Sequence, residues 1–125
     1  MAWHFDSNQA VFLQIANRLR NDIIIGKYAP NEQLPTVRQL ASEAAVNPNT
    51  VQKSLMLLEE EGLIYTRATV GRFITPDTSI ILKARDKMRR EAVRSWISQA
   101  NALGITATEM VNYINECAGE EDISI

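Results

Sequence analysis

Residues 34–50 read LPTVRQLASEAAVNPNT, and this stretch decides the fold. Thr36 and Gln39 have the spacing of a capping box, which satisfies the first free N–H groups of a helix. Asn47 is a favoured N-cap residue and Pro48 a favoured first helical residue. The stretch therefore predicts two short helices joined by a tight turn, which is the pattern of a helix-turn-helix.

The second of these helices, from residue 48 to about 61, divides into an apolar and a polar side. At a turn of about 100° per residue, Val51, Leu55 and Leu58 share one side, which we expect to be buried. The other side carries amide, hydroxyl and ammonium groups near the helix start, where free N–H groups and the helix dipole attract phosphate. Such groups pair with base edges in a DNA groove, whereas the alternative is an ordinary solvated helix face. The polar side comprises Asn49, Thr50, Gln52, Lys53, Met56 and Glu60.

A predicted hairpin follows this helix. Gly62 is a favoured residue after a helix end, and LIYTRATVGRFI comes next. Residues 63–66 and 72–75 are two short β-favouring runs separated by a basic tip that contains glycine. Arg67 and Arg72 flank the tip, where they can contact phosphate or the minor groove. Directly after a helix-turn-helix, this hairpin completes a winged helix.

A helix near the start of the chain supports the same architecture. It is predicted from about residue 9 to residue 25, with Gly26 as its stop. Pro30 and Asn31 suit the two central positions of a type II turn, because Asn tolerates a positive φ. The apolar stripe of this helix consists of Phe12, Ala16, Leu19 and Ile23.

Three segments together resemble the winged-helix DNA-binding domain of the GntR family of bacterial transcription regulators. They are IxxGxxxPxxxLPTxRxLA, NPNTVxKxLxxLEEEGLIYTR and the closing GRFI, which occur in order within residues 9–75. The short remainder resembles the YtrA subfamily. The chain departs from the family pattern at Asn31 and Thr69, where glycine is usual.

The resemblance implies which residues contact DNA. In the family these contacts come from the arginine of the LPxxR segment, from the start of the recognition helix and from the tip of the wing. Carried onto this chain by position, they are Arg38, then Asn47, Asn49, Thr50, Gln52 and Lys53, then Arg67, Thr69 and Gly71.

The C-terminal part predicts two further helices that need a partner surface. Residues 78–103 carry an apolar residue every three to four positions, Gly104 ends this helix, and Thr106 with Glu109 forms a capping box for the next. Two helices alone cannot bury these faces, so we expect a two-fold dimer, with packing onto the winged helix of the same chain as the alternative. The residues predicted at the dimer interface are Ile81, Ala84, Met88, Ala92, Trp96, Leu103, Met110 and Ile114.

Length and charge limit the remaining possibilities. At 125 residues with 46% hydrophobic content, the chain can form one globular domain and a helical appendage. We expect an α+β fold with a winged helix-turn-helix DNA-binding domain in residues 1–75 and a helical dimerisation or effector region in residues 76–125. The net charge of −2 lacks the basic footprint of many DNA-binding proteins. Because residues 59–61 place three acids at the far end of the recognition helix, its start can still be locally positive.

Several classes of protein are not expected. No run approaches the ~20 apolar residues of a membrane span, and the N-terminus lacks the features of a signal peptide, which predicts a cytoplasmic protein without membrane contact. Cys117 has no cysteine partner, and the single histidine, His4, belongs to no pattern of metal ligands. Since no catalytic motif is visible, we expect no enzyme, no metal and no cofactor.

The predicted function follows from the winged helix and the dimer. Two recognition helices related by a two-fold axis read an inverted repeat in double-stranded DNA, which predicts a sequence-specific transcription regulator acting as a homodimer. Resemblance to the YtrA subfamily implies repression. The larger members bind a metabolite in a C-terminal domain; here a small-molecule effector would have to use a cleft in the dimer or the hinge near Pro76 and Asp77. The alternative is a winged-helix protein-interaction module without DNA binding, which the neutral charge favours.

Overall fold

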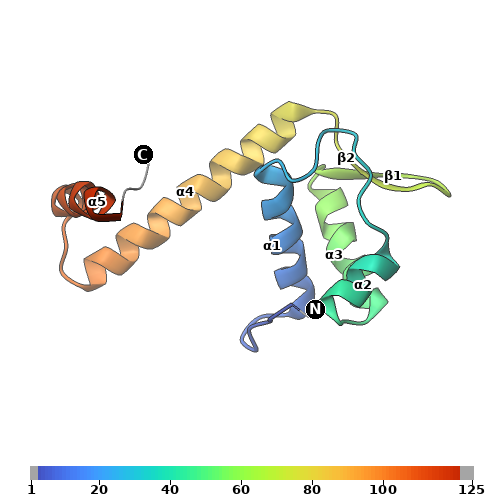
Figure 1. Cartoon of the computed structure of the whole chain (residues 1–125), viewed down its shortest axis with the longest axis horizontal. Helices are drawn as coiled ribbons and strands as arrows, with labels where there is room; N and C mark the ends of the chain where they lie inside the picture. The colour runs from blue at the N-terminus through green and yellow to red at the C-terminus, as the bar shows by residue number, and fades with distance from the viewer. Residues whose placement is uncertain (1–2, 122–125) are drawn as a thin grey trace. The chain divides into compact units, whose positions relative to one another are not determined.

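The computed structural model of the chain describes residues 3–121, which fall into two compact units divided between Arg85 and Asp86. In the first unit, α1 and α3 lie side by side, α2 packs on α3, and the hairpin follows α3 (Figure 1). The fold is α+β, as predicted. Its elements are α1 (Val11–Ile24), α2 (Val37–Ala44), α3 (Pro48–Glu60), β1 (Ile64–Arg67), β2 (Gly71–Ile74), α4 (Thr78–Ala102) and α5 (Ala107–Glu121).

The predicted helix-turn-helix is confirmed down to its caps. The Thr36 hydroxyl accepts a hydrogen bond from the Gln39 N–H at 3.1 Å, and the Gln39 side chain accepts one from the Thr36 N–H at 2.8 Å. The turn after α2 is made by Ala45, with a φ of 59°. Asn47 then caps α3 by accepting from the Asn49 N–H at 2.8 Å. Local polar signals thus set the starts of both helices.

The wing is an antiparallel hairpin tied to the segment before α2. β1 and β2 pair from Ile64 opposite Ile74 to Arg67 opposite Gly71, so each strand lies one residue nearer the tip than predicted. Residues 31–34 run along the other side of β2 and share three backbone hydrogen bonds of 2.9–3.0 Å with it. The wing is therefore anchored to the rest of the domain along β2.

The turn between α1 and α2 has the predicted form. The Ala29 carbonyl accepts from the Glu32 N–H at 3.0 Å, and Asn31 has a φ of 67°. A positive φ at the third residue of a hydrogen-bonded turn is the mark of a type II turn. Asn31 can therefore stand where the family usually has glycine.

The hydrophobic core lies between the three N-terminal helices and the hairpin. The predicted inner side of α3 is buried, with Val51, Leu55 and Leu58 each at 0–1% exposure. Ile81 and Ala84 at the start of α4, which the sequence predicts at a dimer interface, pack against this core of their own chain. Other residues in or against the core are Ile15, Leu19, Ile23, Leu40, Leu63, Ile74, Trp3 and Phe5.

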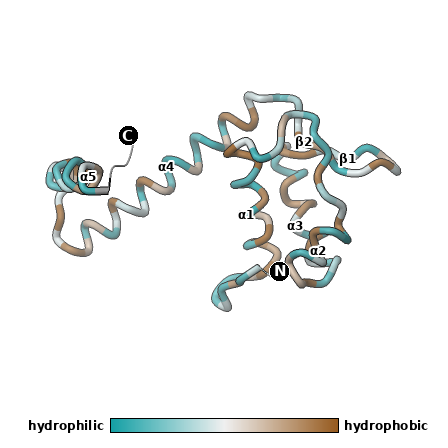
Figure 2. The backbone as a smooth tube through the Cα atoms, viewed as in Figure 1, coloured by the Kyte–Doolittle hydropathy of each residue, from teal (hydrophilic) through white to brown (hydrophobic). Residues whose placement is uncertain are grey.

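The second unit holds most of α4 together with α5. No residue of α4 is buried, and hydrophobic and hydrophilic residues alternate along it (Figure 2). The predicted capping box is present: the Thr106 N–H donates to the Glu109 carboxylate at 3.1 Å, and the Glu109 N–H donates to the Thr106 hydroxyl at 3.2 Å. Hydrogen bonds to the Glu109 carboxylate from the backbone N–H and the side chain of Thr106 lower the pKa of Glu109. Within residues 3–121, no helix is both long and apolar enough to span a bilayer.

Candidate nucleic-acid interface

The polar side of α3 faces solvent. Asn49, Gln52 and Lys53 are exposed, and Thr50 is half-buried. The oxygen of the Asn47 side chain is used in capping, which leaves its NH₂ group to donate outward. The start of α3 therefore presents amide donors and acceptors, a hydroxyl and an ammonium group, the groups that pair with base edges and phosphates.

Lys53 differs from its neighbours because it lies beside α1. Its ammonium nitrogen is 4.3 Å from the centre of the Phe12 ring, a cation–π distance. The two side chains border an open groove of about 330 Å³ between the beginnings of α1 and α3. The groove is lined by Val11, Phe12, Asn49, Thr50 and Lys53.

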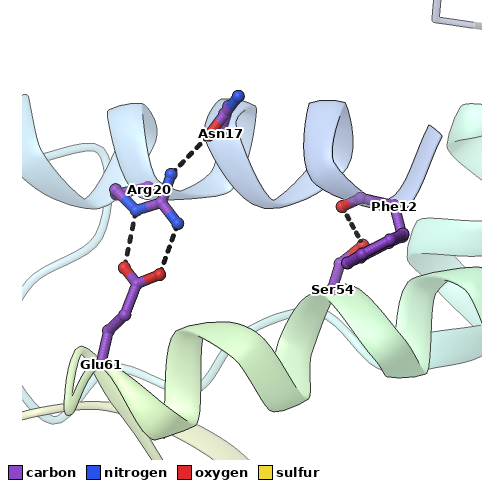
Figure 3. Close-up of polar contacts among 5 residues, drawn as sticks. All are labelled: Phe12, Asn17, Arg20, Ser54 and Glu61. Atoms are coloured by element: carbon purple, nitrogen blue, oxygen red, sulfur yellow. Dashed lines mark hydrogen bonds and ion pairs between the residues drawn. The ribbon is translucent and has the colours of Figure 1, made fainter. Parts of the chain in front are cut away.

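Two polar links join α1 to α3 (Figure 3). Near the start of α1, the buried Ser54 hydroxyl donates to the Phe12 carbonyl at 2.7 Å. Near its end, the Arg20 guanidinium makes a two-pronged contact with the Glu61 carboxylate, at 2.7 and 2.6 Å. Asn17 accepts a further hydrogen bond from Arg20. These links position the recognition helix, and the periodicity of the sequence indicated neither of them.

Arg38 lies in the first turn of α2 and is exposed. Within the described residues its guanidinium makes no ion pair and no side-chain hydrogen bond. The side chain can therefore reach a phosphate beside the recognition helix without first breaking a contact of its own, as the family resemblance implies.

The tip of the wing is built on an unusual threonine conformation. The Val70 N–H donates to the Arg67 carbonyl at 3.0 Å, and Thr69 inside this turn has a φ of 65°. β-branched residues avoid this left-handed region, which glycine favours. Thr69 thus adopts a backbone conformation that glycine favours. Arg67 is exposed beside it, with its guanidinium 5.1 Å from the centre of the Phe73 ring.

Gln33 holds the tip from the side, a role that the sequence did not reveal. Its amide nitrogen donates to the Val70 carbonyl at 2.9 Å. Gly71 has a φ of 140°, and a Cβ there would lie 2.7 Å from that nitrogen. Glycine is therefore needed both for the backbone and for the approach of Gln33. Because the two residues are far apart in the chain, no local pattern connects them.

Arg72 is less free than a surface arginine. It is half-buried in β2, and its Nε is buried without a hydrogen-bond partner in the described part of the chain. Its backbone carbonyl accepts from the Leu34 N–H at 2.9 Å. Arg72 pairs with Thr66, next to the tip, and its side chain is partly enclosed there; its contact with DNA stays a prediction.

Two of the three glutamates in residues 59–61, at the far end of α3, make side-chain contacts within the chain. Glu61 pairs with Arg20, and Glu59 accepts a hydrogen bond from the Thr66 hydroxyl. The positive charge of Arg20 offsets that of Glu61, which reduces the negative potential that would oppose DNA at this end of the helix. Across residues 3–121, no cluster of three or more His, Cys, Asp or Glu residues is arranged to hold a metal ion.

Comparison with known proteins matches this architecture. The sequence profile described as "Bacterial regulatory proteins, gntR family" matches residues 12–74, from α1 to the last residue of β2. The uncharacterized HTH-type transcriptional regulator YhcF of Bacillus subtilis is 34% identical over 110 residues, covering 88% of this chain and 91% of the relative.

Two further similarities extend past the winged helix. The HTH-type transcriptional repressor YtrA of Bacillus subtilis is 28% identical over 115 residues, which is 91% of this chain and 88% of that protein. The solved structure of a GntR family transcriptional regulator from Listeria monocytogenes has a TM-score of 0.84 at 28% identity, covering 90% of this chain and 98% of the other. The similarity therefore includes the C-terminal helices.

Proposed function

This chain belongs to the GntR family of bacterial transcription regulators, which are DNA-binding proteins and not enzymes, and we propose that it is a repressor that binds an inverted-repeat operator as a homodimer. The observation that carries the proposal is the exposed polar start of α3, which the side chain of Asn47 caps and which is flanked by Arg38 and the wing. A recognition helix placed in the major groove uses groups of this kind.

Base reading is assigned to the outward amides of α3. Asn49 and Gln52 each offer an acceptor and two donors, which can pair with both polar atoms of an adenine edge. Arg38, Arg67 and Thr69 lie on the elements to either side, where contacts go to the sugar–phosphate backbone. The proposed site thus separates groups that read sequence from groups that fix position.

The proposed dimer surface lies on α4 and α5. α4 has no fully buried residue, and from Met88 onward its apolar side chains are at least partly exposed in the single chain. Large exposed apolar patches mark association surfaces. Because Ile81 and Ala84 already pack against their own core, the proposed surface begins at Met88. Its most exposed members are Val93, Trp96, Leu103, Val111, Tyr113 and Ile114, at 44–80% exposure.

Repression is proposed because the similar YtrA protein is named a transcriptional repressor. A dimer seated on an operator inside a promoter would exclude the transcription machinery. Regulation by a small-molecule effector stays a prediction. Its proposed binding sites are a cleft in the dimer and the hinge near Pro76 and Asp77.

A second function, a protein-interaction module without DNA, has one observation in its favour. Met56 is 53% exposed on the outward side of α3, where an apolar side chain could contact a protein partner. Met56 lies further along the helix than the amides, however, and methionine also packs against sugars and thymine methyl groups. The same experiment separates the two functions.

The deciding experiment is a genomic binding-site selection with the purified full-length protein, combined with sedimentation in the absence of DNA. We expect enrichment of an inverted repeat whose half-sites are about one helical turn apart, and a dimer at micromolar concentration. Enrichment of single half-sites by a monomer would refute the dimer. No enrichment at all would favour the protein-interaction module.

A further inference from the structure

We propose that the groove between the first turn of α1 and the start of α3 binds one sugar–phosphate unit of the operator backbone, and that Phe12 positions Lys53 for this contact. The inference rests on the proposed DNA binding and adds a helix, α1, to the interface. Nothing in the family pattern of contacts assigns Val11 or Phe12 to DNA.

The position of the Lys53 ammonium group favours contact with a phosphate. Lys53 leaves the polar side of α3 toward α1, and its ammonium group sits 4.3 Å from the centre of the Phe12 ring. It therefore stands at the edge of the recognition helix, whereas Gln52 is exposed and lies outside the groove. When a helix enters the major groove, the groups at its edges meet the backbones that border the groove. A charge in this place suits a phosphate better than a base.

The side chains that line the groove match the chemistry of a sugar–phosphate unit. One wall consists of Val11, 36% exposed, and the ring of Phe12; the other carries the Asn49 amide, the Thr50 hydroxyl and the Lys53 ammonium group. A deoxyribose offers C–H groups to an apolar wall, and its phosphate takes hydrogen bonds from the hydroxyl and the ammonium group. None of the five described lining residues is acidic. The charge of the groove thus complements a phosphodiester.

The groove is already formed in the chain without DNA. The Ser54 hydroxyl ties the Phe12 carbonyl to α3 at 2.7 Å, so the two walls keep a fixed separation (Figure 3). The Phe12 ring then holds the flexible Lys53 side chain near the place where the phosphate would bind. Ordering a lysine before binding reduces the entropy lost on association. Besides its apolar contact with the sugar, which a leucine would keep, Phe12 thus acts through Lys53 as a positioning residue.

The test compares two charge-removing variants of the full-length protein. Lys53→Gln should weaken binding to the selected operator and to a duplex of random sequence by the same factor, because phosphates are common to both. The magnitude of the salt slope should fall by about one. Lys27→Gln is the matched control: Lys27 also lies over an aromatic ring, that of Tyr28 at 5.7 Å, but outside the groove, and both affinities should be unchanged.

A second pair of variants tests the positioning role. Phe12→Leu keeps an apolar side chain but removes the ring, and should weaken both duplexes about twofold to fivefold, the size of an exposed cation–π contact. Phe12→Tyr keeps the ring and should restore binding. Thermal unfolding of each variant checks that the fold is intact, and the double variant Lys53→Gln, Phe12→Leu should bind no more weakly than Lys53→Gln alone.

Other results would each contradict one part of the proposal. Equal behaviour of Lys53→Gln and Lys27→Gln would remove the groove from the interface. Weakening confined to the operator would mean that Lys53 reads a base. Wild-type binding by Phe12→Leu, or a further loss in the double variant, would refute positioning through Lys53. If the unchanged protein binds neither duplex, the proposed function fails, and this inference fails with it.

Discussion

The hydroxyl of Ser54 on α3 and the carbonyl of Phe12 on α1 are joined by a 2.7 Å hydrogen bond across 42 positions of the chain. Ser54 is fully buried, so this polar link runs through the apolar contact of the two helices. With the Arg20–Glu61 ion pair at the other end, it fixes where the recognition helix lies on α1. The position of α3, and not only its sequence, is therefore set by polar contacts between α1 and the recognition helix.

Ser54→Ala should lower the free energy of unfolding by about 1 kcal/mol, the usual net value of a buried hydrogen bond. Ser42→Ala, at an exposed position of α2, is the matched control, because both changes gain the same helix propensity from alanine. Urea unfolding of the two variants measures the difference. Equal stabilities would mean that the Ser54 hydroxyl contributes nothing to the packing of α1 on α3.

Ala45→Gly should stabilise the protein. Ala45 has a φ of 59° in the turn between α2 and α3, and a left-handed conformation costs a residue with a Cβ about 1 kcal/mol that glycine avoids. Ala44→Gly, one position earlier inside α2, should instead destabilise by about 1 kcal/mol. Calorimetric melting temperatures that move in the same direction for both variants would contradict the assignment.

Local sequence patterns predicted most of the fold. The caps at Thr36 and Asn47, the turn at Asn31 and the box at Thr106 each involve residues two or three positions apart, so spacing alone predicted them. Periodicity likewise identified the inner side of α3. The strands were each displaced by a single residue, because strand ends depend on pairing and not on composition.

Long-range contacts could not be predicted in the same way. The links from Ser54 to Phe12 and from Gln33 to Val70 span 42 and 37 positions, and a serine or glutamine carries no mark of such a partner. Lys53 was recognised as a polar residue of the recognition helix, but its position over Phe12 depends on how α1 packs. Geometry between helices, rather than the identity of the residues, was the missing information.

Asn49→Ala should weaken binding to the selected operator by about 1–3 kcal/mol while leaving the fold intact, as expected for an exposed group that pairs with a base. Asn21→Ala, an exposed asparagine near the end of α1, is the control and should bind normally. Leu55→Ala, on the buried side of α3, should instead lower the stability by about 2–5 kcal/mol. Titration at fixed salt concentration measures the affinity. An unchanged affinity of Asn49→Ala would exclude this residue from the site.

Arg38→Ala should weaken all DNA sequences alike and reduce the magnitude of the salt slope by about one, because we assign the guanidinium to a phosphate. Arg38→Lys keeps the charge and should retain most of the affinity. Binding curves on the operator and on a random duplex, each at several salt concentrations, provide the measurement. A loss of specificity with an unaltered slope would mean that Arg38 reads a base.

Trp96→Ala should weaken the dimer, because Trp96 is a large aromatic side chain, 56% exposed on α4, and such residues dominate the energetics of interfaces. Ser98→Ala, two positions further and on another side of the same helix, is the control and should not change the dissociation constant of the dimer. Sedimentation over a range of protein concentrations measures both variants.

The loss of the dimer should then appear in DNA binding. Two linked modules bind two half-sites about 10²–10⁴-fold more tightly than one module binds a single half-site, through effective concentration alone. Trp96→Ala should therefore lose affinity for the full inverted repeat but keep its affinity for an isolated half-site, since the winged helix is untouched. If the variant stays dimeric and binds the full repeat normally, the exposed face of α4 serves some other partner, and the two half-sites must be joined by a different surface.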